Sequence, residues 1–260
     1  MVKKILIKLN IVRKWLRSFL TPPGLVTTLF HKKYYRYLEF GHFEKNQLNK
    51  TSWLGVRAIK PPSDFWVYQE IIWETKPDVI IECGTFEGGS AYFMASICDL
   101  MDHGRIITID NTDSPLRPGH PRITYIKGST ISDETVANVR QLIKPGEKVM
   151  AILDSNHRKR YVLKELEIYG PMVSRDCYLI VEDTHLNGHP VESNYGPGPL
   201  EAVKEFMNPV RSLARAKGAS PEDLGGATSN GMKNNAQFVI DKSREKFLFS
   251  FNRNGYLRRI

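Results

Sequence analysis

The chain has 260 residues, of which 41% are hydrophobic and 25% charged. This composition is typical of a folded globular protein and excludes a disordered one. Its three cysteines form no C-x-x-C pair, so we expect neither a disulfide framework nor a structural zinc site, and the cytoplasm is the expected compartment. The sequence contains no run of about 18 apolar residues, so no transmembrane helix is predicted.

The net charge of +9 is concentrated near the N-terminus. Six basic residues and no acidic residue lie within residues 1–20, and taking these six from +9 leaves only +3 for the rest. A nucleic-acid-binding protein or an RNA methyltransferase would need a basic stripe across its body and more aromatic residues for base stacking. We therefore expect no nucleic-acid partner.

Residues 1–20 are predicted to form a basic amphipathic helix, which Thr21-Pro22-Pro23-Gly24 ends. Such a helix lies on an anionic membrane surface, here the inner face of the membrane, or it docks on its own domain or on a second subunit. The sequence leaves these alternatives open, although the aromatic-rich N-terminal region favours a homo-oligomer. We divide the chain into an arm and connector, 1–50, and a folded domain, 51–260.

Helices and strands are expected to alternate from residue 64 onward. The expected helices are 64–75, with Asp64 as a possible N-cap, then 89–102, 132–143 and 158–172. The expected strands are 79–81, 105–110, 123–126, 149–154 and 178–183, with a last pair near 237–241 and 246–251 after a surface loop at 217–236. Continuously apolar strands between helices predict a doubly wound α/β fold whose mostly parallel sheet is covered on both faces.

A glycine turn follows the first of these strands, in the sequence ECGTFEGGS at 82–90. Gly84 permits a tight turn at the end of the strand, and Gly88 lets a ligand approach the start of the next helix. The spacing G-x-x-x-G-G is not the dinucleotide fingerprint, and the lysine of a phosphate loop is missing. This pattern favours a nucleoside ligand without a pyrophosphate, although any α/β protein can carry glycines here.

The next strand ends in Asp110, which is placed to accept hydrogen bonds from ribose hydroxyls. Glu82 is a carboxylate that could serve the sulfonium and amine of S-adenosylmethionine. We therefore interpret the turn as a binding site for this cofactor. The candidate cofactor-binding residues are Glu82, Gly84, Thr85, Gly88, Ser90, Asp110 and Ser129, the last at the adenine edge.

Three further carboxylates end two other strands: Asp154 in LDSNH, and Glu182 and Asp183 in IVEDT. Carboxylates gathered at neighbouring strand ends repel one another and need a cation, and an all-oxygen set favours a hard one, Mg²⁺. His157 follows Asp154 by three residues and could take a proton from a bound hydroxyl. A surface histidine at a helix start is the alternative interpretation of His157.

These residues together indicate methyl transfer to oxygen. A divalent cation lowers the pKa of bound water from 15.7 to about 7 in favourable cases, and the same Lewis acidity acts on a coordinated hydroxyl. Two adjacent oxygens of a sugar or a catechol could chelate the ion. His185 and His189 lie in the following loop, which either borders the acceptor site or is a rigid turn.

The chain resembles the cephalosporin hydroxylase and rhamnosyl O-methyltransferase family over residues 50–257. The shared motifs are WLG at 53–55, DFWVYQEII at 64–72, IECGT at 81–85, GGS at 88–90, LDSNH at 153–157, IVEDT at 180–184, NGHPV at 187–191, GPGPLE at 196–201, EKF at 245–247 and NGYL at 254–257. The resemblance implies a Rossmann-like class I methyltransferase domain with a seven-stranded sheet whose last strand is antiparallel. It also implies Asp154, Glu182 and Asp183 as metal ligands and His157 as base. Asn156 stands where many members have an acid.

The leading hypothesis is an S-adenosylmethionine- and Mg²⁺-dependent O-methyltransferase that acts on a sugar hydroxyl of a glycolipid or other glycan. The alternative acceptor is a soluble secondary metabolite, with the arm serving oligomerisation. An iron oxygenase would need two histidines and one carboxylate around the metal. The one H-x-E pattern, at 42–44, lies outside the expected sheet.

Overall fold

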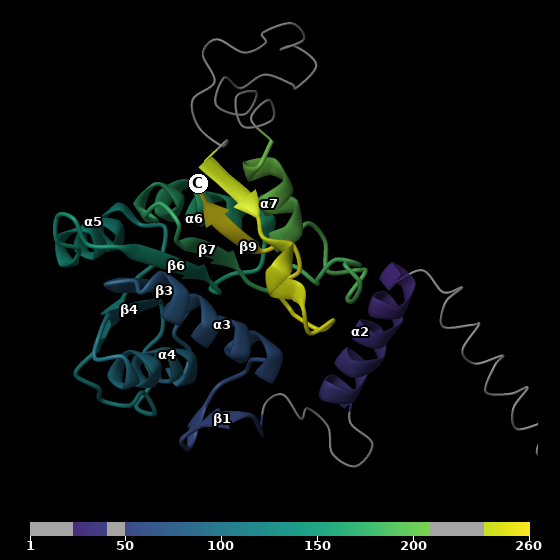
Figure 1. Cartoon of the computed structure of the whole chain (residues 1–260), viewed down its shortest axis with the longest axis horizontal. Helices are drawn as coiled ribbons and strands as arrows, with labels where there is room; N and C mark the ends of the chain where they lie inside the picture. The colour runs from purple at the N-terminus through teal and green to yellow at the C-terminus, as the bar shows by residue number, and fades with distance from the viewer. Residues whose placement is uncertain (1–22, 41–49, 209–236) are drawn as a thin grey trace, which may run out of the picture.

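The computed structural model of the chain describes residues 23–40, 50–208 and 237–260, which are coloured in Figure 1. The expected helix over 1–20 and the expected loop over 217–236 lie outside these ranges. The helices are α2 (Pro23–Phe40), α3 (Pro62–Thr75), α4 (Gly89–Leu100), α5 (Asp133–Leu142), α6 (Lys159–Tyr169) and α7 (Pro199–Phe206), with short 3-10 helices at Gly170–Met172 and Lys242–Glu245. The strands are β1 (Ser52–Trp53), β2 (Val56–Arg57), β3 (Val79–Cys83), β4 (Arg105–Asp110), β5 (Ile123–Lys127), β6 (Val149–Leu153), β7 (Tyr178–Val181), β8 (Phe238–Ile240) and β9 (Tyr256–Arg259).

Seven of these strands form one sheet in the order β5-β4-β3-β6-β7-β9-β8. Neighbours from β5 to β7 pair in parallel, whereas β9 is antiparallel to both β7 and β8. The predicted doubly wound α/β fold is therefore confirmed, as is the antiparallel last strand. The register of β3 against β6 pairs Cys83 with Leu153, so these two strands end side by side and bring the residues that follow them together.

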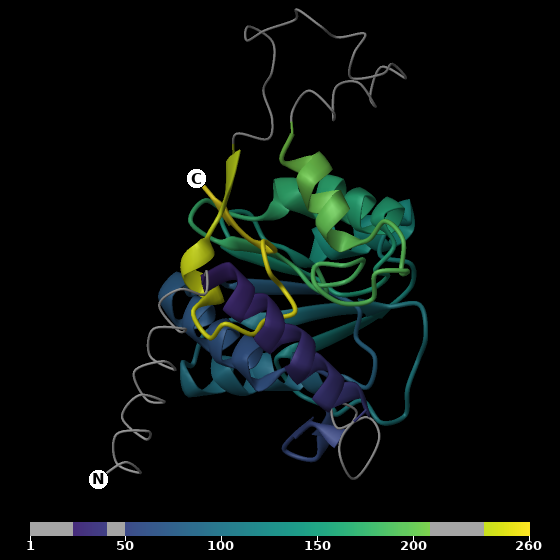
Figure 2. The same cartoon turned by 90° about the vertical axis from the view of Figure 1, so that its right-hand side faces the viewer.

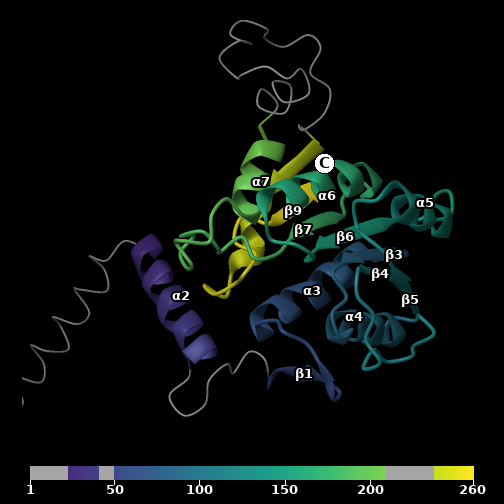
Figure 3. The same cartoon turned by 180° about the vertical axis from the view of Figure 1, so that it is seen from behind.

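Two apolar clusters cover the two faces of the sheet, and Figure 2 shows helices on both of these faces. Alternate residues of β3 face opposite sides, so Ile81 packs in the cluster with α6 and α7, and Ile80 packs in the cluster with α3 and α4. The strands β3, β6 and β7 are buried over their whole length, as their largely apolar sequences predict. The view from behind in Figure 3 shows the same layering, with α6 and α7 on one side and α3 and α4 on the other.

The expected strand over 246–251 is wrong, because the antiparallel partner of β7 is formed by Tyr256–Arg259 instead. The alternating sequence KFLFSF looks like a half-buried strand. In the structure Phe249 and Phe251 are buried in a separate aromatic cluster with Leu38 of α2. Side-chain packing on a distant helix, rather than strand pairing, therefore accounts for the alternation.

The expected N-cap role of Asp64 is also wrong. Pro61 occupies the N-cap position, and Asp64 lies inside the first turn of α3 with its side chain buried. Its carboxylate accepts hydrogen bonds from the Phe251 backbone N–H at 3.0 Å and from the Tyr256 hydroxyl at 3.2 Å. Burial raises the pKa of Asp64 to about 7. The side chain thus joins the C-terminal segment to α3.

The helix α2 stands beside the loops that follow β7 and precede β9 (Figure 1). His31 and Tyr34 of this helix lie against the Phe249 ring, with centroids 4.6 Å and 4.4 Å away.

Within the described ranges, no helix has both the length and the apolar character that crossing a membrane requires.

Candidate active site

A cavity of about 630 Å³ opens at the carboxyl ends of β3, β4 and β6. Its lining comes from the glycine turn after β3, from the ends of β4 and β6, and from the segment 57–60 that crosses above α4. Ligands of open parallel sheets bind at this edge. The cavity therefore opens at the edge of the sheet where the sequence predicts a site.

The glycine turn is fixed by the two strands on either side of β3. Gly84 has a φ of +102°, and a Cβ there would overlap the backbone carbonyl of Asp154. Its N–H donates to Ile109 O at 2.8 Å, while the Asp154 N–H donates to Cys83 O at 2.7 Å. Glycine is needed here because the turn runs directly against the chain that carries Asp154.

Glu82, expected to contact the cofactor, lies beneath the turn and is fully buried. Its two oxygens accept hydrogen bonds from Ser90 Oγ at 2.5 Å and from Thr108 Oγ1 at 2.6 Å. Burial raises the pKa of Glu82 to about 7. The side chain does not line the cavity, so in this structure it supports the turn and the start of α4 from below.

Asp110 lines the cavity, but both of its oxygens already accept hydrogen bonds from the protein. Oδ2 accepts from the Thr85 and Phe86 backbone N–H groups at 3.1 Å and 2.8 Å, and Oδ1 accepts from the Thr112 N–H at 2.9 Å. Burial alone would raise the pKa of Asp110, but the hydrogen bonds from Thr112 and Phe86 lower it below its ordinary value. The carboxylate is thus held ionised and fixed against the glycine turn.

The other candidate cofactor residues divide in the same way. Gly84, Thr85, Ser90 and Ser129 line the cavity. Gly88 is not among the lining residues and instead occupies the N-cap of α4, with a φ of +85°. The structure therefore places five of the seven predicted cofactor residues at the cavity, and it places Glu82 and Gly88 in supporting positions.

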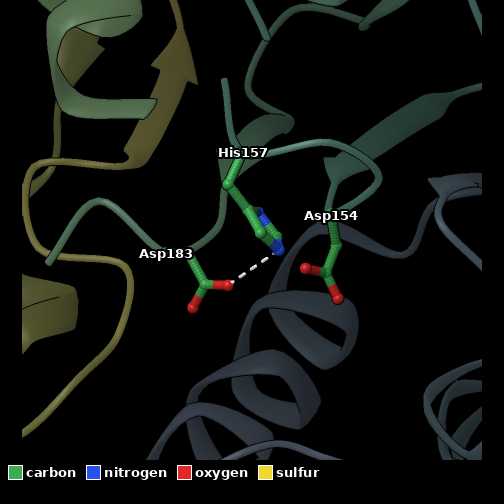
Figure 4. A group of neighbouring side chains, drawn as sticks. All are labelled: Asp154, His157 and Asp183. Atoms are coloured by element: carbon green, nitrogen blue, oxygen red, sulfur yellow. Dashed lines mark ion pairs between the residues drawn. The ribbon is translucent and has the colours of Figure 1, made fainter. Parts of the chain in front are cut away.

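Asp154, His157 and Asp183 come together at one end of the cavity (Figure 4). One ligand atom from each lies within 4.8 Å of the others, which is close enough for all three to hold one metal ion. His157 Nε2 is 3.1 Å from Asp183 Oδ2. Burial alone would lower the pKa of His157, but the carboxylates of Asp183, Asp154 and Glu182 raise it above its ordinary value.

Glu182 is turned away from this group and is buried. Its Oε1 accepts a hydrogen bond from the Tyr68 hydroxyl at 2.6 Å. Its Oε2 lies 2.5 Å from the ammonium of Lys60, which also contacts Asp154 Oδ2 at 2.6 Å. The structure thus joins Glu182 to Asp154 through a lysine, and it places only Asp154 and Asp183 of the three expected ligands in the candidate metal group.

Lys60 is the residue of the site that the sequence interpretation missed. Its side chain is 4% exposed, and it lines the cavity. Burial alone would lower its pKa, but Asp154 and Glu182 raise the pKa well above its ordinary value, so the amine is charged. The local sequence carries no signal for this role, because most lysines are exposed and the partners that permit its burial lie 94 and 122 residues away.

A second missed residue, Glu165 of α6, lies under the cavity floor. It is buried and accepts hydrogen bonds from Thr130 Oγ1 and Ser155 Oγ. Burial raises the pKa of Glu165 to about 7. Because Ser155 and Thr130 both line the cavity, this buried carboxyl group fixes two segments of its wall.

The histidines of the loop after β7 serve two different purposes. His189 Nε2 is 2.6 Å from Glu201 Oε1, so it joins the loop to the first turn of α7. His185 is buried beside the Phe251 ring, and its Nε2 lies 3.9 Å from Asp183 Oδ1. Neither lines the cavity.

Similarity to known proteins identifies the family of this chain. The profile of the family Rhamnosyl O-methyltransferase/CmcI matches residues 45–225. The chain belongs to this family. It is 37% identical over 195 residues to the Rhamnosyl O-methyltransferase of Mycobacterium tuberculosis (strain ATCC 25618 / H37Rv), covering 72% of this chain and 76% of the relative. It is 36% identical over 246 residues to the Rhamnosyl O-methyltransferase of Mycobacterium leprae (strain TN), covering 92% of each chain.

Solved structures of CmcI share the fold. A structure described as CmcI with Mg and SAM superposes with a TM-score of 0.54 at 19% identity, covering 84% of this chain and 80% of that chain. A CmcI structure without ligands gives a TM-score of 0.56, covering 84% and 79%. Family and fold together confirm the expected class, an S-adenosylmethionine-dependent O-methyltransferase with a class I fold.

The donor set suits a hard divalent cation. Asp154 and Asp183 offer carboxylate oxygens, and His157 offers a ring nitrogen, in one group at the cavity wall. Oxygen-rich sites of this kind favour Mg²⁺ or Mn²⁺. The residues present therefore fit a metal of that class.

Proposed function

We propose that this member of the family transfers a methyl group from S-adenosylmethionine to a sugar hydroxyl in a Mg²⁺-dependent reaction, with a rhamnosyl residue of a glycolipid or other glycan as acceptor. The observation that carries the proposal is the position of the Asp154–His157–Asp183 group, in the same cavity as the glycine turn. The rhamnosyl acceptor is supported by the names of the mycobacterial relatives.

The glycine turn and its neighbours would bind the cofactor. Gly84 and Thr85 would lie against its methionine part and Ser129 would contact the adenine edge, since these residues line the cavity. Asp110 also lines it and would accept hydrogen bonds from the ribose in place of those that Oδ1 accepts from Thr112. Gly88 and Ser90 would shape the start of α4 beneath it. Glu82 would act through Ser90, to which it is hydrogen-bonded.

Asp154, Glu182 and Asp183 are the proposed metal ligands, with Glu182 joining the set by giving up its contact with Lys60. Bound in this place, Mg²⁺ supplies Lewis acidity that makes an acceptor hydroxyl easier to deprotonate. His157 is the proposed base that takes the proton, and it stays outside the proposed ligand set because a ring nitrogen bound to the ion could not accept a proton. Asp183, 3.1 Å from His157 Nε2, orients the ring and stabilises its charged form.

The N-terminal arm is proposed to hold the enzyme on an anionic membrane surface, where a lipid-linked acceptor would be found. Residues 1–20 carry six bases and no acid. The helix that follows leaves Leu25, Val26, Leu29 and Phe30 between 43% and 49% exposed. Basic residues beside exposed apolar ones are what peripheral binding to anionic lipid requires.

The metal role is tested with Asp154→Ala. We expect methyl transfer to a rhamnosyl acceptor to be lost while circular dichroism shows an intact fold, because the ion loses a ligand. Asp113→Ala is the matched control, since its side chain is 70% exposed. Unchanged turnover of the Asp154→Ala enzyme, or activity that persists after chelation of divalent ions, would reject the metal role.

The acceptor and the arm need a separate test. Full-length and residue 23–260 proteins are compared for binding to vesicles with and without anionic lipid, and for methylation of lipid-linked rhamnosides against soluble antibiotic glycosides. The proposal expects the truncated protein to leave the vesicles and to lose preference for the lipid-linked acceptor. Equal vesicle binding with a change in oligomeric state would instead assign the arm to subunit contacts.

A further inference from the structure

The buried Lys60 ammonium stands inside the cluster of carboxylates that the family chemistry assigns to a metal. It contacts Asp154 Oδ2 at 2.6 Å and Glu182 Oε2 at 2.5 Å. Its backbone is fixed, because the Lys60 N–H donates to Ala58 O at 3.0 Å and Pro61 and Pro62 follow as the N-cap and the first residue of α3. The fold therefore places a positive charge between Asp154 and Glu182.

Both oxygens of Glu182 accept a hydrogen bond from inside the protein. One of its oxygens accepts from Lys60 and the other accepts from the Tyr68 hydroxyl at 2.6 Å. Tyr68 is itself held by Asn252, whose side-chain amide donates to it at 3.0 Å. Glu182 can therefore turn toward an ion at the Asp154–His157–Asp183 group only by leaving one of two internal donors.

Asp154 is shared differently. Its Oδ2 accepts from Lys60, while the same side chain belongs to the group that can hold an ion with His157 and Asp183. A dication coordinated by Asp154 would lie close to the Lys60 ammonium, and two positive charges repel strongly in a buried site. The lysine and the dication therefore draw on the same negative charge.

We propose that Lys60 is an internal counter-ion that competes with the divalent cation for Asp154 and Glu182, and that it sets the affinity of the site for that cation. The inference rests on the proposed metal role. Lys60 is a positioning residue under this proposal: it holds the two carboxylates in place and yields Glu182 when the ion binds. It does not touch the reacting atoms.

The test measures metal affinity directly, without turnover. Full-length wild-type, Lys60→Gln and Lys60→Arg proteins are titrated with Mg²⁺ by calorimetry and with Mn²⁺ by electron paramagnetic resonance. Lys60→Gln removes the charge and keeps a hydrogen-bond donor, so we expect its dissociation constant to fall at least tenfold. Lys60→Arg keeps the charge and should bind no more tightly than the wild type.

Lys159→Gln is the matched control, because Lys159 pairs with Glu205 at 2.6 Å on the surface, and it should leave the metal affinity unchanged. Equal or weaker metal binding by Lys60→Gln, with a normal wild-type titration, would overturn the competition while leaving the metal role intact. Absence of binding in both proteins would overturn the metal role and the competition together.

A second measurement needs no substitution and remains valid if Lys60→Gln fails to fold. The lysine ammonium signals of ¹⁵N-labelled wild-type protein are followed by nuclear magnetic resonance during a Mg²⁺ titration. A buried ammonium with two carboxylate partners should give a slowly exchanging signal that shifts and loses its protection as the site saturates. A Lys60 signal that stays unchanged at saturation would contradict the proposal.

Discussion

At the residue scale, Gly84 shows how closely the proposed cofactor-binding turn lies against Asp154, a proposed metal ligand. We expect Gly84→Ala to destabilise the fold by about 2–4 kcal/mol and to weaken cofactor binding more than tenfold, because the new Cβ would overlap the Asp154 carbonyl in a backbone with φ near +102°. Chemical denaturation and calorimetry measure the two effects.

Gly146→Ala is the matched control for this substitution. Gly146 also has a positive φ, of +85°, but nothing lies within 4 Å of the added atom. It should cost only about 1 kcal/mol of conformational strain. Equal losses in the two variants would show that strain, and not the contact with Asp154, explains the requirement for glycine at position 84.

His157 carries the second prediction at this scale. Replacement by Gln should lower the turnover of a sugar acceptor by about 10² to 10⁴-fold, the usual contribution of a general base. Cofactor affinity should stay the same, because His157 lies beside Asp183 rather than beside the glycine turn. A variant that keeps wild-type turnover would remove His157 from the mechanism, and one that loses cofactor binding would give it a different role.

At the scale of elements, Arg105 at the start of β4 and Glu147 before β6 form a two-pronged ion pair, with N–O distances of 2.7 Å and 2.8 Å. The Arg105 hydrogen bonds lower the pKa of Glu147 to about 2. Because the folded pKa lies below the ordinary value of 4.5, the stabilisation is present above pH 4.5 and is lost as the pH falls toward 2.

We therefore expect Glu147→Gln to reduce the free energy of unfolding by about 1 kcal/mol at pH 7, a modest figure because both groups are partly exposed to water. The difference from wild type should shrink steadily below pH 4.5. Urea denaturation at several pH values gives this comparison. A difference that stays constant down to pH 3 would mean that packing, and not charge, links the two elements.

The attachment of α2 is a second question at the element scale. Phe249 is 4% exposed and lies against His31 and Tyr34 of that helix. Phe249→Ala should cost about 3 kcal/mol and should speed amide hydrogen exchange in α2. Phe247→Ala is the control, since Phe247 is 42% exposed. Unchanged exchange in α2 would show that other contacts hold the helix.

These elements also show what the sequence can and cannot predict. The strands β6 and β7 are predictable because each is a continuous apolar run, and topology then brings Asp110, Asp154 and Asp183 to one edge of the sheet. The aromatic segment around Phe249 was mistaken for a strand, since its alternation reflects packing on α2. Local pattern identifies a buried side but does not name the surface that buries it.

The direction of a side chain was equally hard to predict. Glu182 and Asp183 are neighbours in the sequence, yet one contacts Lys60 and Tyr68 and the other contacts His157. The direction of Glu182 depends on Tyr68 and Lys60, which precede it by 114 and 122 positions in the chain. The order of the strands predicts where the carboxylates lie, but it does not show which of them pair with Lys60.

At the scale of the whole molecule, the cavity that we propose for the cofactor joins segments from residue 57 to residue 183. A ligand that binds only the folded state stabilises it by about 2.7 kcal/mol at 100 times its dissociation constant. S-adenosylmethionine at that level should therefore raise the Tm by about 5–10 °C in a domain of this size. Differential scanning fluorimetry measures this shift.

The Asp154→Ala protein should show most of the same rise in Tm, because it loses a metal ligand and keeps the turn. ATP is the negative control, since the turn lacks the lysine of a phosphate loop. No rise with S-adenosylmethionine in the wild type would contradict the assignment of the cavity to the cofactor.

The pairing of β3 with β6 has a consequence for how this enzyme can change over evolution. The methyl donor would rest on the tip of one strand and the acceptor on the tip of its immediate neighbour, so the distance between them is built into the sheet. A new acceptor cannot be accommodated by moving either tip without losing the reaction geometry. Changes in acceptor preference should therefore accumulate at cavity-lining positions outside these two strand ends, such as Arg57 and Tyr161.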